Sequence, residues 1–235
     1  IPEDAKVTLQ GGSRCRLTGK LTGKGTIYYT TPYVRADWQM NMSSFNGTFH
    51  ALGSQMRLNQ ATDMSKTSLV LNDKVLLVHT KAGSGTEVNL TTKIGSLAST
   101  SKECTVGRGT YEIGYNNEST TYAGLFANTA VVKKYGEGTL TLTNKQPIGF
   151  SVYGGTLFLN SEGSSEGTIQ VYNGGCLSGN GTANNVTVYE GGSIAAEKSE
   201  YLRGSMQING QLTVNEGGCI PVSYTHLRAH ETDSY

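Results

Sequence analysis

The sequence contains little charge, little proline and no long hydrophobic run, and each shortage excludes a class of protein. Charged residues make up 16% of the 235 residues and the net charge is +1, so no electrostatic footprint for nucleic acid or an anionic membrane is present. No apolar run reaches 18 residues, which excludes a membrane-spanning helix. Proline occurs 4 times and glycine 31 times, which indicates regular corners rather than a disordered Pro/Gly tract.

Cysteine is also scarce, and its spacing does not fit a metal or redox site. None of the four cysteines forms a CxxC pair, so a zinc or thioredoxin-like interpretation is poor. Cys176 and Cys219 occupy equivalent places in two copies of a repeat, with Ser193 at that place in the copy between them. Stacked two rungs apart, they would be separated by about 9.6 Å, beyond the roughly 7 Å between Cα atoms that a disulfide allows. We therefore expect both to be small residues filling corners.

The repeat itself is the strongest signal in the chain. Each copy has a valine before a Gly-Gly pair and an aliphatic residue two positions after the pair, which is the period-2 spacing of strands that turn a corner at glycine. Aligned on the second glycine, successive copies are 20, 17 and 26 residues apart, a period typical of solenoid coils. The copies are Val152–Leu157, Val171–Leu177, Val188–Ile194 and Val214–Ile220.

These features predict an all-β chain that forms a parallel β-helix, a single-stranded solenoid in which each coil is one rung. At about 22 residues per rung, residues 1–220 give roughly ten rungs. Gly-x-Gly-Thr occurs five times along the chain, which indicates one architecture in both halves, and no helix is expected. Two columns of stacked side chains are predicted: Leu157, Leu177, Ile194 and Ile220 form one, and Val152, Val171, Val188 and Val214 the other.

The chain divides into three parts by regularity. We expect irregular rungs with loop excursions over residues 1–130, regular rungs over 131–222, and a non-native tail over 223–235. The tail resembles translated adapter sequence, so His226 and His230 receive no functional weight. Within the first part, residues 32–38 are predicted to be a loop or bulge, 58–68 a surface excursion, 72–74 a tight turn, and 87–90 a strand.

The segment Val131–Asn144 resembles the passenger-associated, or autotransporter-associated, β-strand repeat. That motif has a lysine, then Gly-x-Gly-Thr-Leu-x-Leu and a polar turn, followed by a half similar to Tyr153–Asn160. The resemblance is specific over residues 131–220, and Thr22–Tyr33 and Ser43–Phe49 are more weakly similar to large surface proteins of gut Bacteroidota. The resemblance to this repeat implies a right-handed parallel β-helix on an exported bacterial protein, extracellular or at the outer-membrane surface.

Aromatic and charged side chains are densest around Arg35-Ala36-Asp37-Trp38. Rings that stack on sugar faces, beside side chains that bond hydroxyls, would make a carbohydrate platform. Alternatively, this segment is a loop whose Trp38 covers the end or side of the β-helix. A second aromatic feature is a possible ladder of Tyr153, Tyr172 and Tyr189, which would either bind a ligand or stabilise the stack. The residues assigned to the platform are Tyr28, Tyr33, Arg35, Asp37 and Trp38.

Carboxylates are sparse, which argues against catalysis within the chain. The four aspartates outside the tail are Asp4, Asp37, Asp63 and Asp73, and none lies within three residues of another. Polysaccharide lyases need clustered carboxylates for calcium, and glycoside hydrolases need two at a defined separation. Stacking would still allow Asp63 and Asp73 to meet. We expect no catalytic residues, no cofactor and no metal site.

The leading hypothesis is a non-catalytic β-helical stalk or passenger segment for display or adhesion. The alternative is an accessory, carbohydrate-binding segment of a polysaccharide lyase or glycoside hydrolase, and a third hypothesis is an adhesin that uses the tyrosine face. Expected partners are glycans or a host surface, with self-association through the open ends of the β-helix unless they are capped.

Overall fold

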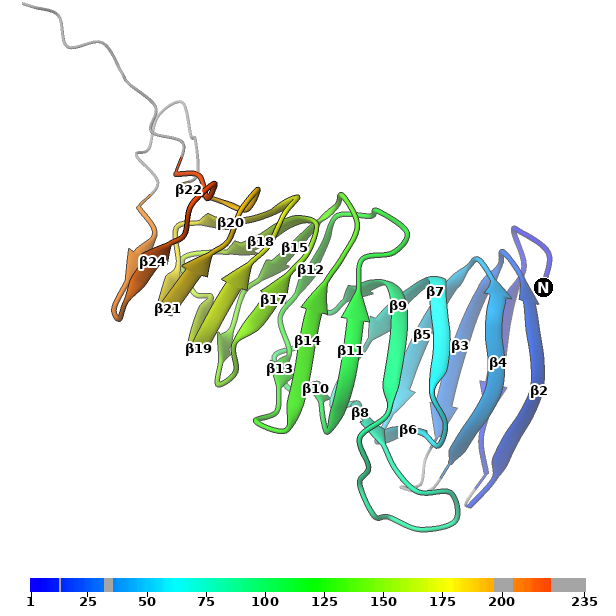
Figure 1. Cartoon of the computed structure of the whole chain (residues 1–235). Helices are drawn as coiled ribbons and strands as arrows, with labels where there is room; N and C mark the ends of the chain where they lie inside the picture. The colour runs from blue at the N-terminus through cyan, green and yellow to red at the C-terminus, as the bar shows by residue number, and fades with distance from the viewer. Residues whose placement is uncertain (13, 32–35, 197–204, 221–235) are drawn as a thin grey trace, which may run out of the picture.

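The computed structural model describes residues 1–12, 14–31, 36–196 and 205–220, and these form a β-solenoid of about nine turns. Every element in the described ranges is a strand and none is a helix, as the sequence predicts. Figure 1 shows the rungs stacked one after another into an elongated body. The number of rungs is close to the roughly ten expected.

One long parallel sheet runs the length of the body, and two shorter sheets succeed one another beside it. Most rungs contribute a strand to the long sheet and a strand to one of the side sheets. The side sheet changes in one rung, where β12 (Thr120–Tyr122) begins the second side sheet and β13 (Leu125–Phe126) ends the first. The long sheet and the hydrophobic core continue through this rung, so the two halves share one stack.

The three sheets have the following strands. The long sheet contains β1 (Lys6–Gln10), β3 (Thr26–Thr31), β5 (Thr48–Gly53), β7 (Thr62–Leu71), β9 (Thr91–Ala98), β11 (Gly109–Ile113), β14 (Ala130–Lys134), β16 (Lys145–Gln146), β17 (Phe150–Val152), β19 (Ser164–Val171), β21 (Thr182–Val188), β23 (Gln207–Ile208) and β24 (Leu212–Val214). The first side sheet contains β2 (Arg16–Gly23), β4 (Asp37–Phe45), β6 (Gln55–Leu58), β8 (Leu76–His79), β10 (Thr105–Val106) and β13. The second contains β12, β15 (Thr139–Leu142), β18 (Gly155–Leu159), β20 (Gly175–Gly179) and β22 (Ser193–Ala196).

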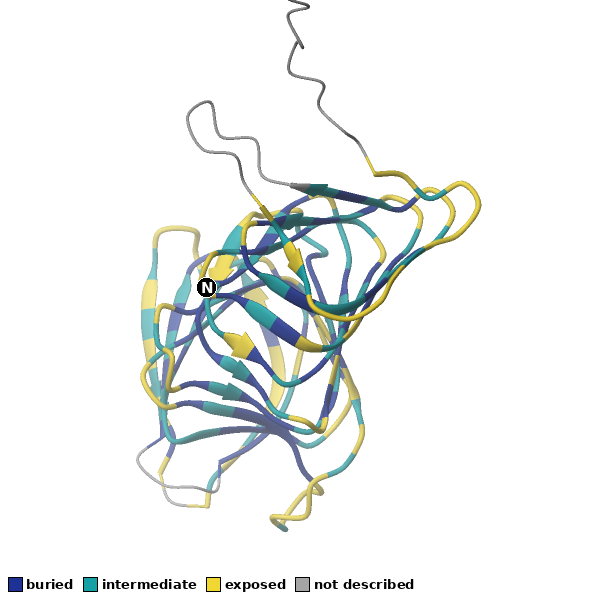
Figure 2. Cartoon of the chain, turned by 90° about the vertical axis from the view of Figure 1, so that its left-hand side faces the viewer, coloured by how far each residue is buried: buried dark blue, intermediate teal, exposed yellow. Residues whose placement is uncertain are grey.

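The predicted side-chain columns are present in the regular half. The pairing register aligns Val152, Val171, Val188 and Val214 in the long sheet, and Leu157, Leu177 and Ile194 in the second side sheet. Ile220, the expected end of the second column, is 45% exposed. Cys176 and Cys219 both pair with Ser193, so they lie two rungs apart as predicted, and both thiols are free. Figure 2 shows buried residues alternating with more exposed ones along the rungs.

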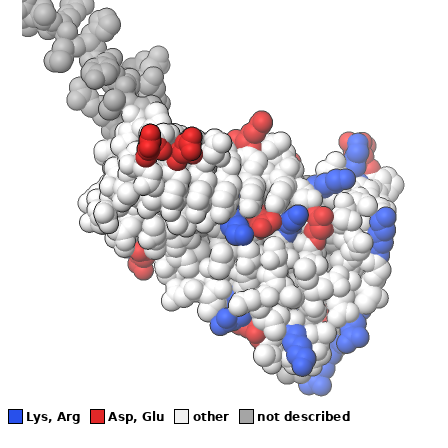
Figure 3. Space-filling view, in the orientation of Figure 1, with Lys and Arg blue, Asp and Glu red and all other residues white. Residues whose placement is uncertain are grey.

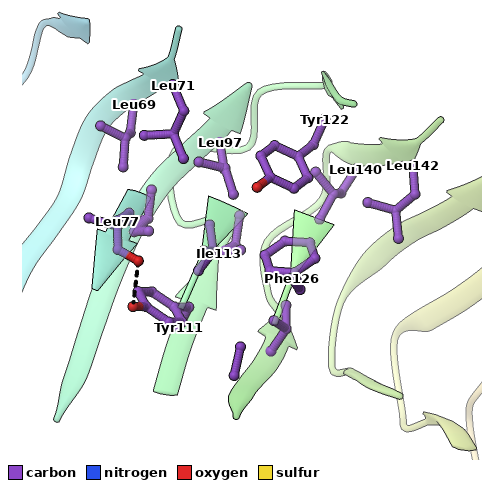
Figure 4. Close-up of a cluster of buried hydrophobic side chains, with 14 of the residues drawn as sticks. Leu69, Leu71, Leu77, Leu97, Tyr111, Ile113, Tyr122, Phe126, Leu140 and Leu142 are labelled. Atoms are coloured by element: carbon purple, nitrogen blue, oxygen red, sulfur yellow. Dashed lines mark hydrogen bonds between the residues drawn. The ribbon is translucent and has the colours of Figure 1, made fainter. Parts of the chain in front are cut away.

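Aromatic rings fill much of the core in the first half and at the change of side sheet. Trp38 packs edge-on against Tyr29 and Phe49, with ring centroids 5.2 and 5.1 Å apart. Around the change of side sheet, leucines from several rungs surround Tyr111, Tyr122 and Phe126 (Figure 4). Tyr111 donates its buried hydroxyl to the carbonyl of Arg108 at 3.2 Å. Tyr122 likewise donates its hydroxyl to the carbonyl of Leu125 at 3.2 Å, whereas the hydroxyl of Tyr29 and the indole N–H of Trp38 are buried without a hydrogen-bond partner among the described residues.

Three local predictions in the first half are wrong. Residues 58–68 are not an excursion, because β7 occupies most of them and pairs with β9. Their polarity belongs to outward positions, and the inward Thr67 donates its hydroxyl to the carbonyl of Phe45. The excursion instead lies at residues 80–90, where the expected strand 87–90 is reduced to one antiparallel bridge between Thr80 and Glu87.

The third wrong prediction concerns residues 32–38. Asp37 and Trp38 open β4, so they are strand rather than loop, and residues 32–35 lie outside the described ranges. By contrast, the tight turn predicted at 72–74 is confirmed, with the amide of Val75 donating to the carbonyl of Asn72 at 3.2 Å.

Glycine is required where a corner meets the backbone of the neighbouring rung. Gly179 has a φ of +128°, and a Cβ there would overlap the carbonyl oxygen of Leu159. A side chain at this position is therefore excluded both by its backbone conformation and by the close approach of two rungs. Gly12 differs, because it has open space around its Cα.

We predict that Gly179→Ala lowers the free energy of unfolding by at least about 2 kcal/mol, because strain and overlap add. Gly12→Ala, the matched control, should change it by less than about 1 kcal/mol. Urea unfolding followed by circular dichroism would measure both. Equal urea midpoints for the two variants would contradict the assignment of Gly179 as a packed corner.

Candidate binding surfaces

The structure separates the residues of the expected carbohydrate platform. Trp38 is fully buried, at 0% exposure, in the aromatic core, so its expected role as a sugar-stacking ring is wrong. Tyr28 lies on the outer face of the long sheet and stacks on His50 at 4.8 Å. Asp37 is 9% exposed and accepts the amide hydrogen of Gly83 at 2.8 Å. These three residues do not share a surface.

The remaining two residues of that platform, Tyr33 and Arg35, lie outside the described ranges. Pro32, Arg35 and Asp37 precede Trp38 in the sequence, and such residues favour the prediction of an exposed loop. The alternation from Asp37 onward is the signal that would have placed Trp38 inside. In β4 the sequence Trp38-Gln39-Met40-Asn41-Met42 alternates apolar with polar residues, which is the pattern of a half-buried strand.

A tyrosine ladder follows one corner of the solenoid over five rungs. Neighbouring rings are nearly parallel, with interplanar angles of 2–17° and centroids 4.5–5.2 Å apart. The sequence predicted the last three members, and Tyr135 precedes a glycine in the same way. Tyr115 was missed because it follows its glycine instead of preceding it. The members are Tyr115, Tyr135, Tyr153, Tyr172 and Tyr189.

Each inner ring of the ladder has both faces covered by its neighbours, so only ring edges and hydroxyls face the solvent. One end is capped, because the ammonium of Lys93 lies 5.7 Å from the centroid of Tyr115. At the other end, Gln170 donates to the hydroxyl of Tyr189 at 3.2 Å. Burial, with the neighbouring tyrosines, raises the pKa of Tyr172 above its ordinary value. The ladder therefore stabilises the stack and presents a row of hydroxyls.

A buried lysine lies beneath this ladder. Lys134 takes the place in the long-sheet column between Ile113 and Val152 and is 1% exposed. Its ammonium donates to the carbonyls of Tyr135, Gly136 and Gly154 at 2.6, 3.1 and 3.1 Å. Three donors meet three acceptors from two successive rungs, so the lysine joins their corners.

The sequence did not predict this buried lysine, because a lysine beside Lys133 suggests two exposed charges. Alignment of Lys134 with Val152 in the following rung is the signal that marks it as an inward residue. Burial lowers its pKa to about 8. The ammonium remains the main form at neutral pH.

Asp63 and Asp73 do not form a carboxylate pair. Asp63 lies near the start of β7, and Asp73 lies beyond its end, so stacking does not bring them together. Glu118 accepts hydroxyl hydrogens from Ser68 and Ser96, both at 2.6 Å. Burial alone would raise the pKa of Glu118, but these hydrogen bonds and one from Asn116 hold it below its usual value. Glu118 therefore acts as an ionised acceptor that joins neighbouring rungs.

The fold defines the class of this chain as a β-solenoid protein. Comparisons with protein-family models, curated proteins and solved structures each found no match. Within the described ranges, no three His, Cys, Asp or Glu side chains gather where they could hold a metal ion. The described residues also contain no helix long and apolar enough to cross a membrane.

We predict that Tyr172→Ala lowers the free energy of unfolding by about 2 kcal/mol, because two stacked contacts are lost together with their buried area. Tyr172→Phe keeps the stack and should cost less than half as much. Urea unfolding of both variants provides the measurement. If both variants lost the same stability, the hydroxyl rather than ring stacking would be responsible.

Lys134 generates a prediction about pH. Its pKa is about 8 in the folded chain and about 10.4 when unfolded, so the folded chain releases this proton first. Its contribution to stability should therefore rise with pH between those values, and the cost of burying the charge is present in full below pH 8.

Between pH 7 and pH 9, the wild-type chain should gain about 1 kcal/mol of stability relative to Lys134→Met. Subtracting the variant removes the tyrosine titrations that the two chains share. Urea unfolding at both pH values provides the measurement. A constant difference between wild type and variant would contradict the lowered pKa.

Proposed function

We propose that the chain is a non-catalytic stalk or passenger segment of an exported bacterial surface protein, used for display or adhesion. The observation that carries the proposal is the continuous stack. One long sheet and one hydrophobic core run through about nine turns, which at about 4.8 Å per rung corresponds to roughly 43 Å of reach. A solenoid of this kind lengthens by adding rungs, because each rung contacts only its neighbours.

The side chains on the outer surface support a role in surface display better than a role in catalysis. Glu118 is a structural acceptor, and Glu162 is an exposed partner of Lys102 at 2.6 Å. The resemblance of residues 131–220 to passenger-associated repeats supports export and a place at the cell surface. The tyrosine ladder supports adhesion through hydroxyls and ring edges, since its inner ring faces are covered.

The second candidate is an accessory segment of a polysaccharide lyase or glycoside hydrolase. The feature in its favour is the row of tyrosine hydroxyls, which follows the solenoid axis and repeats every 4.5–5.2 Å at the ring centroids. Such a row suits a long, hydroxyl-rich polymer lying along the rod. Glycans are partners in both candidate functions.

We predict that an antibody against residues 131–196 labels intact cells of the bacterium that encodes the chain, and that protease added to those cells removes the signal. A periplasmic protein is the control for cell integrity. Labelling that requires permeabilised cells would contradict surface display.

The purified chain should also release no reducing ends or unsaturated uronates from pectin, alginate or xylan, because stacking does not bring Asp63 and Asp73 together. A known lyase and a known hydrolase are the positive controls. Turnover by the purified chain would overturn the non-catalytic assignment while leaving the surface location to the labelling experiment.

A further inference from the structure

A basic pocket lies where the first side sheet meets the 80–90 excursion. Its volume is about 400 Å³, within the range of small-ligand sites. Figure 3 shows Lys and Arg side chains gathered at this lower corner of the molecule, whereas much of the visible surface is uncharged. The described residues that line the pocket are Arg14, Cys15, Arg16, Asp37, Arg57 and Gly83.

The stacking register builds this pocket. Arg16, Asp37 and Arg57 are paired positions in β2, β4 and β6, so an aspartate lies between two arginines along the stack. Asp37 and Arg57 are each at least nine-tenths buried, at 9% and 8% exposure. Arg14 and Arg16 are exposed at the rim.

The guanidinium groups are not neutralised within the described residues. None of the three arginines has a carboxylate within the 4.0 Å of an ion pair. Arg57 donates only to neutral acceptors, the side-chain oxygen of Gln55 at 2.8 Å and the carbonyl of Ser84 at 3.5 Å. Burying a cation that makes no direct ion pair is costly. An anion in the pocket would remove that cost.

The carboxylate of Asp37 limits which anions can bind in the pocket. Its Oδ2 accepts the amide hydrogen of Gly83, and no hydrogen bond from a described residue to its Oδ1 is present. A carboxylate beside the ligand disfavours a doubly charged phosphate, and it favours a singly charged group that also carries hydroxyl donors. Arginine forks match a planar carboxylate with two parallel hydrogen bonds.

We propose that this pocket binds an acidic sugar of the uronic acid class. The sugar carboxylate contacts the guanidinium groups of Arg14, Arg16 and Arg57, and a sugar hydroxyl donates to Asp37. The site is distinct from the tyrosine ladder, and it does not depend on whether the chain acts as a stalk.

The test uses the exposed arginines, because Asp37 and Arg57 also hold the 80–90 excursion in place. Neither Arg14 nor Arg16 makes a side-chain hydrogen bond or ion pair with a described residue, so the double variant Arg14→Gln/Arg16→Gln should fold normally. The matched control is Lys6→Gln/Lys20→Gln. It removes two exposed charges from β1 and β2 outside the pocket.

Binding is measured with the whole chain by titration with glucuronate, glucose, acetate and sulfate, followed by NMR of the arginine side chains. Glucuronate should shift these signals and bind more tightly than the other three. The affinity should fall at least about tenfold in Arg14→Gln/Arg16→Gln, as expected for loss of charge-assisted hydrogen bonds. It should remain within about twofold in the lysine control, and it should weaken as salt is raised.

Four results would overturn the proposal. Equal binding of glucose would remove the role of the negative charge, and equal binding of acetate would remove the role of the hydroxyls. Tighter binding of sulfate than of glucuronate would show a general anion site. An equal loss of affinity in the lysine control would show that overall charge, rather than the pocket, attracts the ligand.

Discussion

The constraint on which this structure depends is the hydrogen-bonded register between successive rungs. Parallel pairing places each residue directly over its counterpart about 4.8 Å away, so a side chain meets the same position of the next rung, inside or outside the coil. The same rule produces the column of Val152, Val171 and Val188 in the core and the tyrosine ladder at the corner. It also explains the glycines, since a corner such as Gly179 lies against the backbone of its neighbour.

Register also decides whether a buried charge is tolerated. Lys134 is placed inside, yet the corners at Tyr135, Gly136 and Gly154 supply three carbonyl acceptors for its three protons. Arg57 is buried to a similar degree but finds only neutral acceptors, and the nearest position along the stack that carries a carboxylate is Asp37, whose Oδ2 is engaged by Gly83. The ammonium of Lys134 therefore joins two rungs, whereas Arg57 lines the basic pocket. That contrast separates a structural cation from one suited to a ligand.

The regular half could be predicted from sequence because its corners are marked by Gly-Gly pairs, which set both the register and the inward positions. The first half lacks those marks. There the polar residues at outward positions of β7 resembled a loop. The proline and charged residues near Trp38 also favoured a loop, although Trp38 lies in strand β4. The tyrosine ladder was partly predictable, because four of its five members precede a glycine, although only Tyr153, Tyr172 and Tyr189 were predicted. The basic pocket could not be predicted from sequence, because Arg16, Asp37 and Arg57 are about twenty residues apart and become neighbours only through stacking.

The change of side sheet at β12 and β13 gives the two halves different surfaces on one core. The first side sheet leads to the 80–90 excursion and the basic pocket, whereas the regular half, built on the second side sheet, carries most of the tyrosine ladder with its uncharged hydroxyls. Because the long sheet and the hydrophobic core are continuous, these two surfaces are held at a fixed separation along the axis. A solenoid that only provided reach would not require different chemistry at its two ends. The difference supports the proposal that the rod presents binding groups as well as length.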